Sequence, residues 1–544
     1  MRTMLIRRFV GLLPPQHLIA LAWRVQPERE LIVCGNRRLT RQQARAQVEA
    51  LAGALQALGV RPGDRVATLL PACPEAVYAL FLPWLLGSIE VPLNPLLGEE
   101  ELGHCLADSG ARVVLAARGW CGRDYRTMLA RLRPQLPALE TVLLQGEGPL
   151  GTGELALSDL LAGARPLRRM PISPRGIGRL SYTSGTTGLP KGVAHTREAY
   201  WRLAHPSVSG RLDLSLLRCL LLPFPPYHYA GWLGVAATFL AGGKVVLLDR
   251  PNPQEALALI QRERVTQVGC SPTLARLLLA AAGGPAGLRT AAWGTLAADR
   301  GGYDLSSLRR ITLGSEPCPP GLVQALHERL HCDVEAMYGM TETGIISWTA
   351  LGDPWQRAAE TVGRPAPGSQ VRIVDDEHRP LPAGERGEVA VRSVQMMVGY
   401  WGDPSLTQRS FDREGWFYTG DVGWLDGEGY LHLVDRKKDL VIRGGENVAP
   451  AEVERILEAH PQVRRAAVIG VPGALGEALW AYIEPAAEAL TARDLVEHCR
   501  GRLAPYQIPD QVRLLGRLPT TATGKVKKHE LRRLALMEGS HAAS

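Results

Sequence analysis

The first half of the chain alternates between helical and strand-like patterns of apolar residues. Apolar side chains recur every three or four positions between Thr40 and Gly59, at Ala44, Val48, Leu51, Leu55 and Leu58. This spacing is typical of a helix with one buried face, and Thr40 and Gly59 are typical residues for its start and its end. Short apolar runs follow at 66–70, 112–116 and 141–144, with another helical stretch from Pro74. The alternation predicts an α/β domain built on a largely parallel sheet.

The C-terminal part of the chain has a different pattern. A helical stretch at 450–460 is followed by strand-like runs at 466–471 and 479–483, and then by a helix that Thr491 can cap. This order predicts a small α+β domain. We expect two domains, residues 1–434 and residues 435–544, with the boundary in the charged segment that begins at Asp435.

Length and composition are those of a globular protein with more than one domain. The chain has 544 residues, of which 46% are hydrophobic and 21% are charged. Its nine cysteines are scattered and include no C-x-x-C pair, which favours a reducing compartment over disulfides or a thiolate zinc site. The most apolar stretch, 77–89, contains Pro83 and is shorter than the roughly 20 residues that cross a bilayer. We therefore expect a cytoplasmic protein without a membrane span.

The net charge of +8 is concentrated near the C-terminus. Between Arg500 and Arg533 there are nine Lys or Arg residues and two acidic residues. A basic segment of this kind suits an anionic ligand such as a nucleotide or the phosphates of coenzyme A (CoA). A nucleic acid, a membrane surface or plain solvent would suit it as well. Charge alone leaves these alternatives open.

Two short motifs match known signatures but lack the context that those signatures need. His327, Glu328 and His331 form H-E-x-x-H, the zinc peptidase pattern, but no third ligand is apparent nearby. An ordinary amphipathic helix with Leu322, Leu326 and Leu330 inward explains the same residues. The stretch 146–151 reads G-x-G-x-x-G but contains Pro149 and opens no clear helix. We expect a turn there and no dinucleotide site.

The strongest chemical signal is the stretch Y-T-S-G-T-T-G-L-P-K-G-V at 182–193. A strand-like segment leads into hydroxyl side chains, two glycines and Lys191. Glycines let main-chain N–H groups approach phosphate oxygens, hydroxyls donate further bonds, and lysine supplies a positive charge. The pattern is not a Walker A motif, because Pro190 precedes the lysine and Gly192 follows it. It predicts a phosphate-binding loop.

At this point the sequence resembles the adenylate-forming superfamily, which includes acyl-CoA synthetases, adenylation domains of peptide synthetases and firefly luciferases. The resemblance runs from about residue 39 to residue 534, with several motifs in the family's order. It implies an α/β fold with a large N-terminal domain of packed β/α subdomains and a small, mobile α+β C-terminal domain. The stretch 283–302 is longer than the family's pattern leads us to expect.

The resemblance also implies the residues that bind the nucleotide. The phosphate loop comprises Thr183, Ser184, Gly185, Thr186, Thr187, Gly188 and Lys191. The adenine-binding strand end comprises Gly314, Ser315, Glu316 and Pro317. A following motif comprises Tyr338, which stacks on adenine, Gly339, Thr341, which meets the α-phosphate, and Glu342, which holds Mg²⁺. A carboxylate is a suitable ligand for this hard cation. Asp421 would bind the ribose hydroxyls, and Arg436 would face the ribose or the phosphates.

Further residues are implied for the acid, for CoA and for domain motion. His228 resembles a gate residue beside the acyl pocket, whose wall continues through Gly231 and Trp232. Lys525, in P-T-T-A-T-G-K, resembles the lysine that bridges the substrate carboxylate and the α-phosphate. The CoA tunnel is implied at Gly444, Gly445 and Glu446, and the hinge at Lys438. Lys191, Thr341, Glu342 and Lys525 are the implied catalytic set.

The implied reaction is that of an AMP-forming acid–thiol ligase with ATP, Mg²⁺ and CoA. A carboxylate attacks the α-phosphorus of ATP, and a thiol then attacks the acyl-adenylate. CoA is the expected acceptor, because the chain stops soon after Lys525 and we expect no fused carrier domain there. A free-standing carrier protein is the alternative within the class. A zinc peptidase and a catalytically silent nucleotide-binding protein are the alternatives outside it.

The partners and the acid are less closely defined. We expect small-molecule substrates and no nucleic acid, and peripheral membrane association and a homodimer stay open. Relatives that activate amino acids place an Asp near the gate, whereas residues 227–232 include no acidic residue. The expected substrate is an apolar carboxylic acid without an α-amino group, aliphatic or aromatic.

Overall fold

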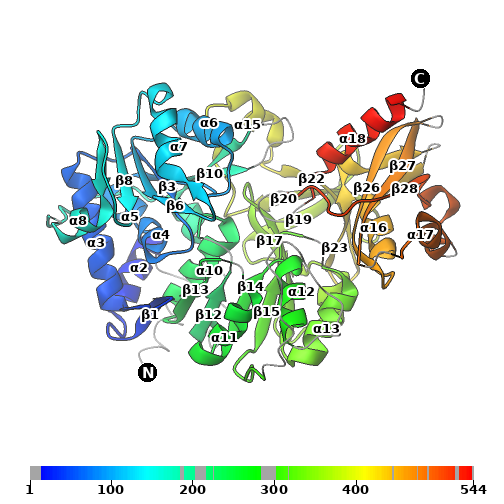
Figure 1. Ribbon diagram of the computed structural model, residues 1–544, viewed down its shortest axis with the longest axis horizontal. Coiled ribbons are helices and arrows are strands. Elements are labelled where there is room, and N and C mark those ends of the chain that lie inside the picture. Colours follow the sequence, from blue (N-terminus) through cyan, green and yellow to red (C-terminus); the bar gives the residue numbers. More distant parts are fainter. Residues whose placement is uncertain are drawn as a thin grey trace.

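A computed structural model describes residues 14–163, 165–183, 189–202, 216–223, 226–250, 252–282, 302–316, 318–443, 446–473, 476–486, 489–500, 502–520 and 526–541. The predicted long stretch at 283–302 lies almost entirely outside these ranges. Within them, no helix has the length and apolar character needed to cross a bilayer. The described elements include two large sheets, a smaller sheet and a separate C-terminal sheet (Figure 1), and each large sheet combines strands from distant parts of the chain.

The first large sheet runs in the order β21-β11-β10-β4-β3-β5-β8-β9 and carries the predicted phosphate loop. Its pairs from β10 to β9 are parallel, as predicted, and β11 and β21 add antiparallel pairs at one edge. The strands are β3 (Arg65–Leu69), β4 (Ile89–Pro92), β5 (Val113–Ala117), β8 (Thr141–Gln145), β9 (Glu154–Ala156), β10 (Ile177–Thr183), β11 (Lys191–Thr196) and β21 (Gly399–Tyr400).

The two helices predicted in this region, after Thr40 and from Pro74, are present. The first of them, α3, begins after a capping box between Thr40 and Gln43 and buries Ala44, Val48, Leu51 and Leu55. The helices are α3 (Arg41–Ala57), α4 (Pro74–Ala79), α5 (Leu82–Leu86), α6 (Glu99–Ser109), α7 (Tyr125–Leu132), α8 (Leu157–Ala162) and α9 (Arg197–Arg202). A short ribbon of β6 (Gly119–Trp120) and β7 (Arg123–Asp124) and the turn η1 (Arg133–Gln135) complete the region.

The second large sheet runs in the order β18-β17-β16-β15-β14-β12-β13-β1-β2. Its strands are β1 (Glu30–Cys34), β2 (Arg37–Thr40), β12 (Cys219–Leu222), β13 (Lys244–Leu247), β14 (Gln267–Cys270), β15 (Arg310–Leu313), β16 (Asp333–Met340), β17 (Gly344–Trp348) and β18 (Arg364–Pro365). The accompanying helices are α2 (Pro15–Arg24), α10 (Tyr229–Leu240), α11 (Pro253–Glu263), α12 (Pro272–Ala281), α13 (Pro320–Leu330) and α14 (Trp355–Glu360), with the turn η2 (Leu216–Arg218). The N-terminal hairpin β1–β2 thus pairs with a strand about 200 residues away.

A smaller sheet links the large sheets to the C-terminal domain. It runs in the order β19-β20-β22-β23 and is antiparallel throughout. Its strands are β19 (Ser369–Val374), β20 (Gly387–Ser393), β22 (Phe417–Leu425) and β23 (Leu431–Arg436), with α15 (Pro404–Ser410) between β21 and β22.

The C-terminal domain has its own sheet and core, as the pattern of residues predicted. In Figure 1 it occupies the orange-to-red end of the molecule, beside β23. Its elements are β24 (Val441–Arg443), β25 (Glu446–Val448), α16 (Pro450–Glu458), β26 (Val463–Gly473), β27 (Gly476–Pro485), α17 (Ala492–Cys499), β28 (Gln511–Leu514) and α18 (Lys528–His541), with turns η3 (Lys437–Asp439) and η4 (Pro505–Gln507). Thr491 caps α17 with a capping box, as predicted.

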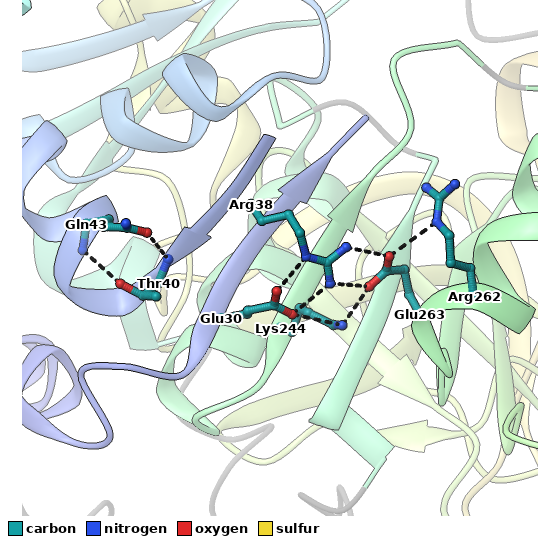
Figure 2. A network of polar contacts seen from close by, with 7 residues as sticks. All are labelled: Glu30, Arg38, Thr40, Gln43, Lys244, Arg262 and Glu263. Carbon is teal, nitrogen blue, oxygen red and sulfur yellow. Dashed lines mark hydrogen bonds and ion pairs between the residues drawn. The ribbon is translucent and has the colours of Figure 1, made fainter. Parts of the chain in front are cut away.

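A buried carboxylate attaches the N-terminal hairpin to the second large sheet (Figure 2). Glu263, at the end of α11, accepts bonds from Arg38 of β2 and Lys244 of β13, both at 2.8 Å. Arg38 also contacts Glu30 at 2.6 Å, which closes the network within the hairpin. The Glu263 side chain is 2% exposed, whereas that of Arg38 is 44% exposed. The hydrogen bonds from Arg38 are the main reason that the pKa of Glu263 falls to about 2.

We predict that this network stabilises the fold in a pH-dependent way. The folded pKa of about 2 lies below the ordinary value of 4.5, so the pairing contributes fully above pH 4.5 and less as the pH falls toward 2. Glu263→Gln should cost about 1–2 kcal/mol at pH 7, a value reduced for the exposure of Arg38. Thermal unfolding at pH 7 and at pH 3.5 should show the gap between wild type and variant shrinking at the lower pH.

A matched control is Glu49→Gln, which removes a carboxylate paired at 3.1 Å with Arg45 and with Arg169 at the surface. Exposed pairs of this kind contribute little, so its melting temperature should stay close to that of the wild type. A gap between wild type and Glu263→Gln that is equally large at both pH values would contradict the proposed linkage.

Candidate active site

The predicted phosphate loop is the connection between two antiparallel strands. Thr183 ends β10, Lys191 begins β11, and the two residues are direct partners in the ladder. Ser184, Gly185, Thr186, Thr187 and Gly188 lie outside the described residues. Both arms of the hairpin are bonded to α6: the Tyr182 hydroxyl donates to Asp108 at 2.5 Å, and His104 Nε2 lies 2.9 Å from the Pro190 carbonyl oxygen. The base of the loop, with Lys191, is therefore fixed to the first sheet.

A second group of predicted residues meets at the smaller sheet. Asp421 of β22 and Arg436 of β23 are register partners, and Arg436 Nε contacts Asp421 Oδ1 at 2.9 Å. The Tyr338 hydroxyl, from β16 of the second sheet, donates to Asp421 Oδ2 at 2.5 Å. Burial, with the Asp421 charge, raises the pKa of the Tyr338 phenol well above its ordinary value, so it remains a donor. Both oxygens of this buried carboxylate are thus engaged.

Thr341 and Glu342 lie in the turn between β16 and β17. The two strands approach so closely that a Cβ on Gly339 would lie 2.3 Å from the Gly344 carbonyl oxygen, so only glycine fits there. The Glu342 carboxylate accepts a bond from the Tyr400 hydroxyl at 3.1 Å. Burial raises the pKa of the Glu342 carboxyl, and the Tyr400 hydroxyl, Arg436 and Lys191 oppose that rise. Glu342 therefore lies within electrostatic reach of Lys191 and Arg436.

The segment predicted to bind adenine follows β15. Ser315 has a φ of +73°, a left-handed conformation that is uncommon outside glycine and often marks a functional site. Glu316 Oε2 accepts a bond from Thr273 at 3.0 Å. Glu316 Oε1 is buried and has no hydrogen-bond partner among the described residues. Gly314 precedes these two residues, and Pro317 lies outside the described ranges.

His228 lies immediately before α10, on a segment held by Arg179. Arg179 Nη2 donates to the Tyr227 carbonyl at 2.9 Å, and Nη1 contacts Glu90 Oε2 at 2.9 Å. Burial, with the Arg179 charge, lowers the pKa of His228, so its imidazole is neutral at neutral pH. Gly231 and Trp232 lie in the first turn of α10.

Trp232 packs inward. Its side chain is fully buried, with its ring centroid 3.6 Å from that of Tyr200 and 5.5 Å from that of Trp201. Burial against these two aromatic rings fixes the first turn of α10, on which His228 depends for its position. The predicted contact of Trp232 with the acid stays a prediction.

The residues on either side of Lys438 are bonded to different domains. Lys437 Nζ contacts Asp376 at 2.9 Å and Glu388 at 3.1 Å in the large domain. Asp439 accepts a bond from Arg532 of α18 at 3.0 Å in the small domain. The side chains of Lys438 and Glu446 are not described, and Gly444, Gly445 and Lys525 lie outside the described residues.

The structure also shows the conformation of the two short motifs, H-E-x-x-H at 327–331 and G-x-G-x-x-G at 146–151. The helix α13 ends at Leu330, and His331 has a left-handed φ of +51°. The two histidines of H-E-x-x-H are therefore not on one continuous helix, and Leu322 and Leu326 point into the core as expected. In the described ranges no cluster of His, Cys, Asp and Glu could hold a metal ion. The G-x-G-x-x-G stretch is a turn whose carbonyls at Gly146, Gly148 and Pro149 accept bonds from Arg118.

Sequence reasoning missed Arg179, Glu90 and Tyr400. Arg179 in β10 and Glu90 in β4 are only 1% and 3% exposed. Charged residues are rarely fully buried unless they are paired, but the residue pattern predicts no strand around Glu90, so this pair had no local signal. Tyr400 had no local signal either, because its partner Glu342 is distant in the sequence.

Comparisons of the sequence with family descriptions and with known proteins agree on one family. The description "AMP-binding enzyme" matches residues 20–401, and "AMP-binding enzyme C-terminal domain" matches residues 452–525. Feruloyl-CoA synthase from Amycolatopsis sp is 36% identical over 520 residues, covering 94% of this chain and 96% of that protein. Medium-chain fatty-acid–CoA ligase from Escherichia coli (strain K12) is 33% identical over 491 residues, covering 89% and 83%.

A solved structure agrees with these sequence relatives. The anthranilate CoA ligase AuaEII, in complex with anthranoyl-AMP, superposes with a TM-score of 0.87 at 28% identity, covering 97% of this chain and 98% of that one. Both the large and the small domain are therefore matched. The chain belongs to the AMP-binding enzyme family, the adenylate-forming enzymes that its motifs resemble.

Proposed function

We propose that this enzyme activates a carboxylic acid with ATP to an acyl-AMP and then transfers the acyl group to CoA. It is an AMP-forming acid–thiol ligase that uses ATP, Mg²⁺ and CoA. The observation that carries this proposal is that motifs assigned to the nucleotide from distant parts of the chain are bonded to one another. Main-chain N–H groups of residues 397 and 401 donate to the carbonyls of Glu342 and of Gly192, next to Lys191. Arg436 pairs with Asp421, which also accepts a bond from Tyr338 of the motif that contains Glu342.

The reaction needs no side-chain nucleophile. A carboxylate oxygen of the acid attacks the α-phosphorus, and pyrophosphate leaves with the bonding electrons of the broken P–O bond. The thiol sulfur of CoA then attacks the acyl carbon, loses its proton, and AMP leaves. The protein contributes orientation and positive charge where negative charge develops. Lys191 and Lys525 are the proposed sources of that charge.

Glu342 is the proposed ligand of Mg²⁺. When bound, the ion would neutralise phosphate oxygens and polarise the phosphorus toward attack. The residues present fit such an ion, because an oxygen ligand is supplied on a turn that lies within electrostatic reach of Lys191 of the phosphate loop. Thr341, beside Glu342, would meet the α-phosphate.

The nucleoside would be held by the other predicted residues. Glu316 Oε1 is a buried acceptor without a partner among the described residues, which suits the exocyclic amino group of adenine. Tyr338 would stack on the base, and Asp421 would accept bonds from the ribose hydroxyls. The bonds of Asp421 to Tyr338 and Arg436 keep the carboxylate in place for that task.

We propose Lys438 as the pivot between a domain of residues 1–434 and a domain of residues 435–544. Lys437 is bonded to the large domain and Asp439 to the small one. A rotation between the domains that keeps these contacts must therefore fall on the backbone of Lys438. Gly444, Gly445 and Glu446 would line the CoA tunnel after that rotation. The scattered cysteines favour a cytoplasmic location.

The first prediction concerns the acid. The two relatives are named for the feruloyl group, which is aromatic, and for medium-chain fatty acids. Residues 227–232 contain no carboxylate to pair with an α-ammonium group. We predict an apolar aromatic or aliphatic acid, measured as CoA-dependent AMP release with a panel of acids. Activity with free α-amino acids alone would contradict the assignment.

The second prediction concerns Glu342. Glu342→Gln keeps the shape but removes the charge that holds Mg²⁺, so pyrophosphate exchange should fall by about 10²-fold or more. Glu360→Gln, at an exposed position on α14, is the control and should keep normal exchange. Near-normal activity and an unchanged Mg²⁺ requirement in Glu342→Gln would show that the metal is held elsewhere.

The third prediction separates the two half-reactions. Lys525→Ala should slow acyl-AMP formation by about 10²–10³-fold, since it removes a positioned charge at a developing oxyanion. The same variant should convert synthetic acyl-AMP and CoA to thioester at close to the normal rate. Lys438→Pro should do the opposite, because proline fixes φ near −65° and obstructs rotation.

The control for the hinge is Lys438→Ala, which removes the same side chain but leaves the backbone free. It should support both half-reactions. If Lys525→Ala and Lys438→Pro slow both steps equally, domain rotation about Lys438 is not part of the mechanism.

A further inference from the structure

A short segment after β20 connects the start of β11, next to Lys191, to the turn that carries Glu342. We call residues 395–401 the strap. The main-chain N–H of Met397 donates to the Glu342 carbonyl at 2.8 Å. The N–H groups of Val398 and Trp401 donate to the carbonyls of Ala194 and Gly192, each at 2.7 Å. The strap thus holds the first residues of strand β11, next to Lys191, and the Glu342 main chain at the same time.

The side chain of Gln395 extends the connection. Gln395 is fully buried, and its Oε1 accepts a bond from the Ile345 N–H at 3.0 Å, on the far side of the same turn. The turn is therefore bonded to the strap both at Glu342 and beyond it. Its backbone therefore has little freedom to shift relative to β11.

Tyr400 carries the connection to the carboxylate itself. It belongs to β21 and is the register partner of Val193 in β11. Its N–H donates to Thr407 Oγ1 of α15 at 2.9 Å, and its hydroxyl donates to Glu342 Oε1 at 3.1 Å. The side chain is therefore anchored at its main chain and aimed at one oxygen of Glu342.

We propose that Tyr400 is a positioning residue for the metal: its hydroxyl holds Oε1 of Glu342 so that Oε2 faces the ion beside the phosphate loop. This inference rests on the proposed role of Glu342. A carboxylate on a flexible side chain must lose rotational freedom when it binds a cation. A bond from an anchored hydroxyl fixes the rotamer in advance, and a ligand held in advance binds its ion more tightly.

The test is Tyr400→Phe, which removes the hydroxyl and keeps the ring. Its matched control is Tyr430→Phe, which removes a hydroxyl that donates to a carboxylate, Asp353, at 2.9 Å, outside the residues assigned to the site. Affinity for Mn²⁺, measured by electron paramagnetic resonance with a non-hydrolysable ATP analogue, is a readout that does not depend on turnover. The Mg²⁺ concentration that half-saturates pyrophosphate exchange is the second readout.

In Tyr400→Phe, both readouts should weaken roughly tenfold, the loss expected for one hydrogen bond to a charged group. The thioester step from synthetic acyl-AMP should change less than twofold, and Tyr430→Phe should match the wild type in both metal readouts. An unchanged Mn²⁺ affinity in Tyr400→Phe would overturn the inference. If that variant also slowed both half-reactions equally, Tyr400 would act through packing and not through the metal.

Glu342→Gln in the same experiment separates the two levels of the argument. A loss of Mn²⁺ affinity in Glu342→Gln without a loss in Tyr400→Phe overturns only the role of Tyr400. An unchanged Mn²⁺ affinity in Glu342→Gln overturns the metal assignment itself and, with it, the inference drawn from it.

Discussion

A single buried guanidinium, that of Arg179, joins the two large sheets at the strand that leads into the phosphate loop. It contacts Glu90 of β4 at 2.9 Å and the Tyr227 carbonyl, just before α10, at 2.9 Å. Loss of one partner of a buried ion pair typically costs about 3–5 kcal/mol, because the other charge stays buried and unpaired. It therefore connects β10 and β4 of the first sheet to the segment before α10, alongside the apolar core that the two large sheets share. The proposed gate residue His228 and the strand that enters the proposed phosphate loop are thus connected through Arg179.

The candidate site lies where the ends of several strands converge. Thr183 ends β10, Gly314 follows β15, and Thr341 follows β16. The carboxyl ends of the parallel strands in α/β proteins commonly form the ligand site, because the chain leaves the sheet there in loops that are free to vary. The smaller sheet adds Asp421 and Arg436 from the side. Strands of the two large sheets and of the smaller sheet therefore carry the residues proposed for the nucleotide, and the strap bonds β11 to the turn after β16.

Partly exposed ion pairs of described residues connect the small domain to the large one. Arg276 of α12 meets Glu458 of α16 at 3.2 Å, and Arg386 meets Glu452 at 3.4 Å. Partly exposed pairs of this kind are worth little individually, so they can be exchanged for others at small cost. Such a boundary is compatible with the rotation proposed for Lys438, whereas the apolar core of each domain stays intact.

The sequence by itself determined the elements and the chemistry of the motifs. The helix at Thr40, the strands at 66–70 and 141–144 and the capped helix at Thr491 follow from local periodicity and capping, which act over a few residues. The phosphate loop was recognisable because its residues are contiguous. Only the tertiary structure decided that β1 joins the second sheet, that Glu90 pairs with Arg179, and that Tyr400 bonds to Glu342. These contacts join residues between 58 and more than 200 positions apart, and no local pattern encodes which distant partner a side chain will meet.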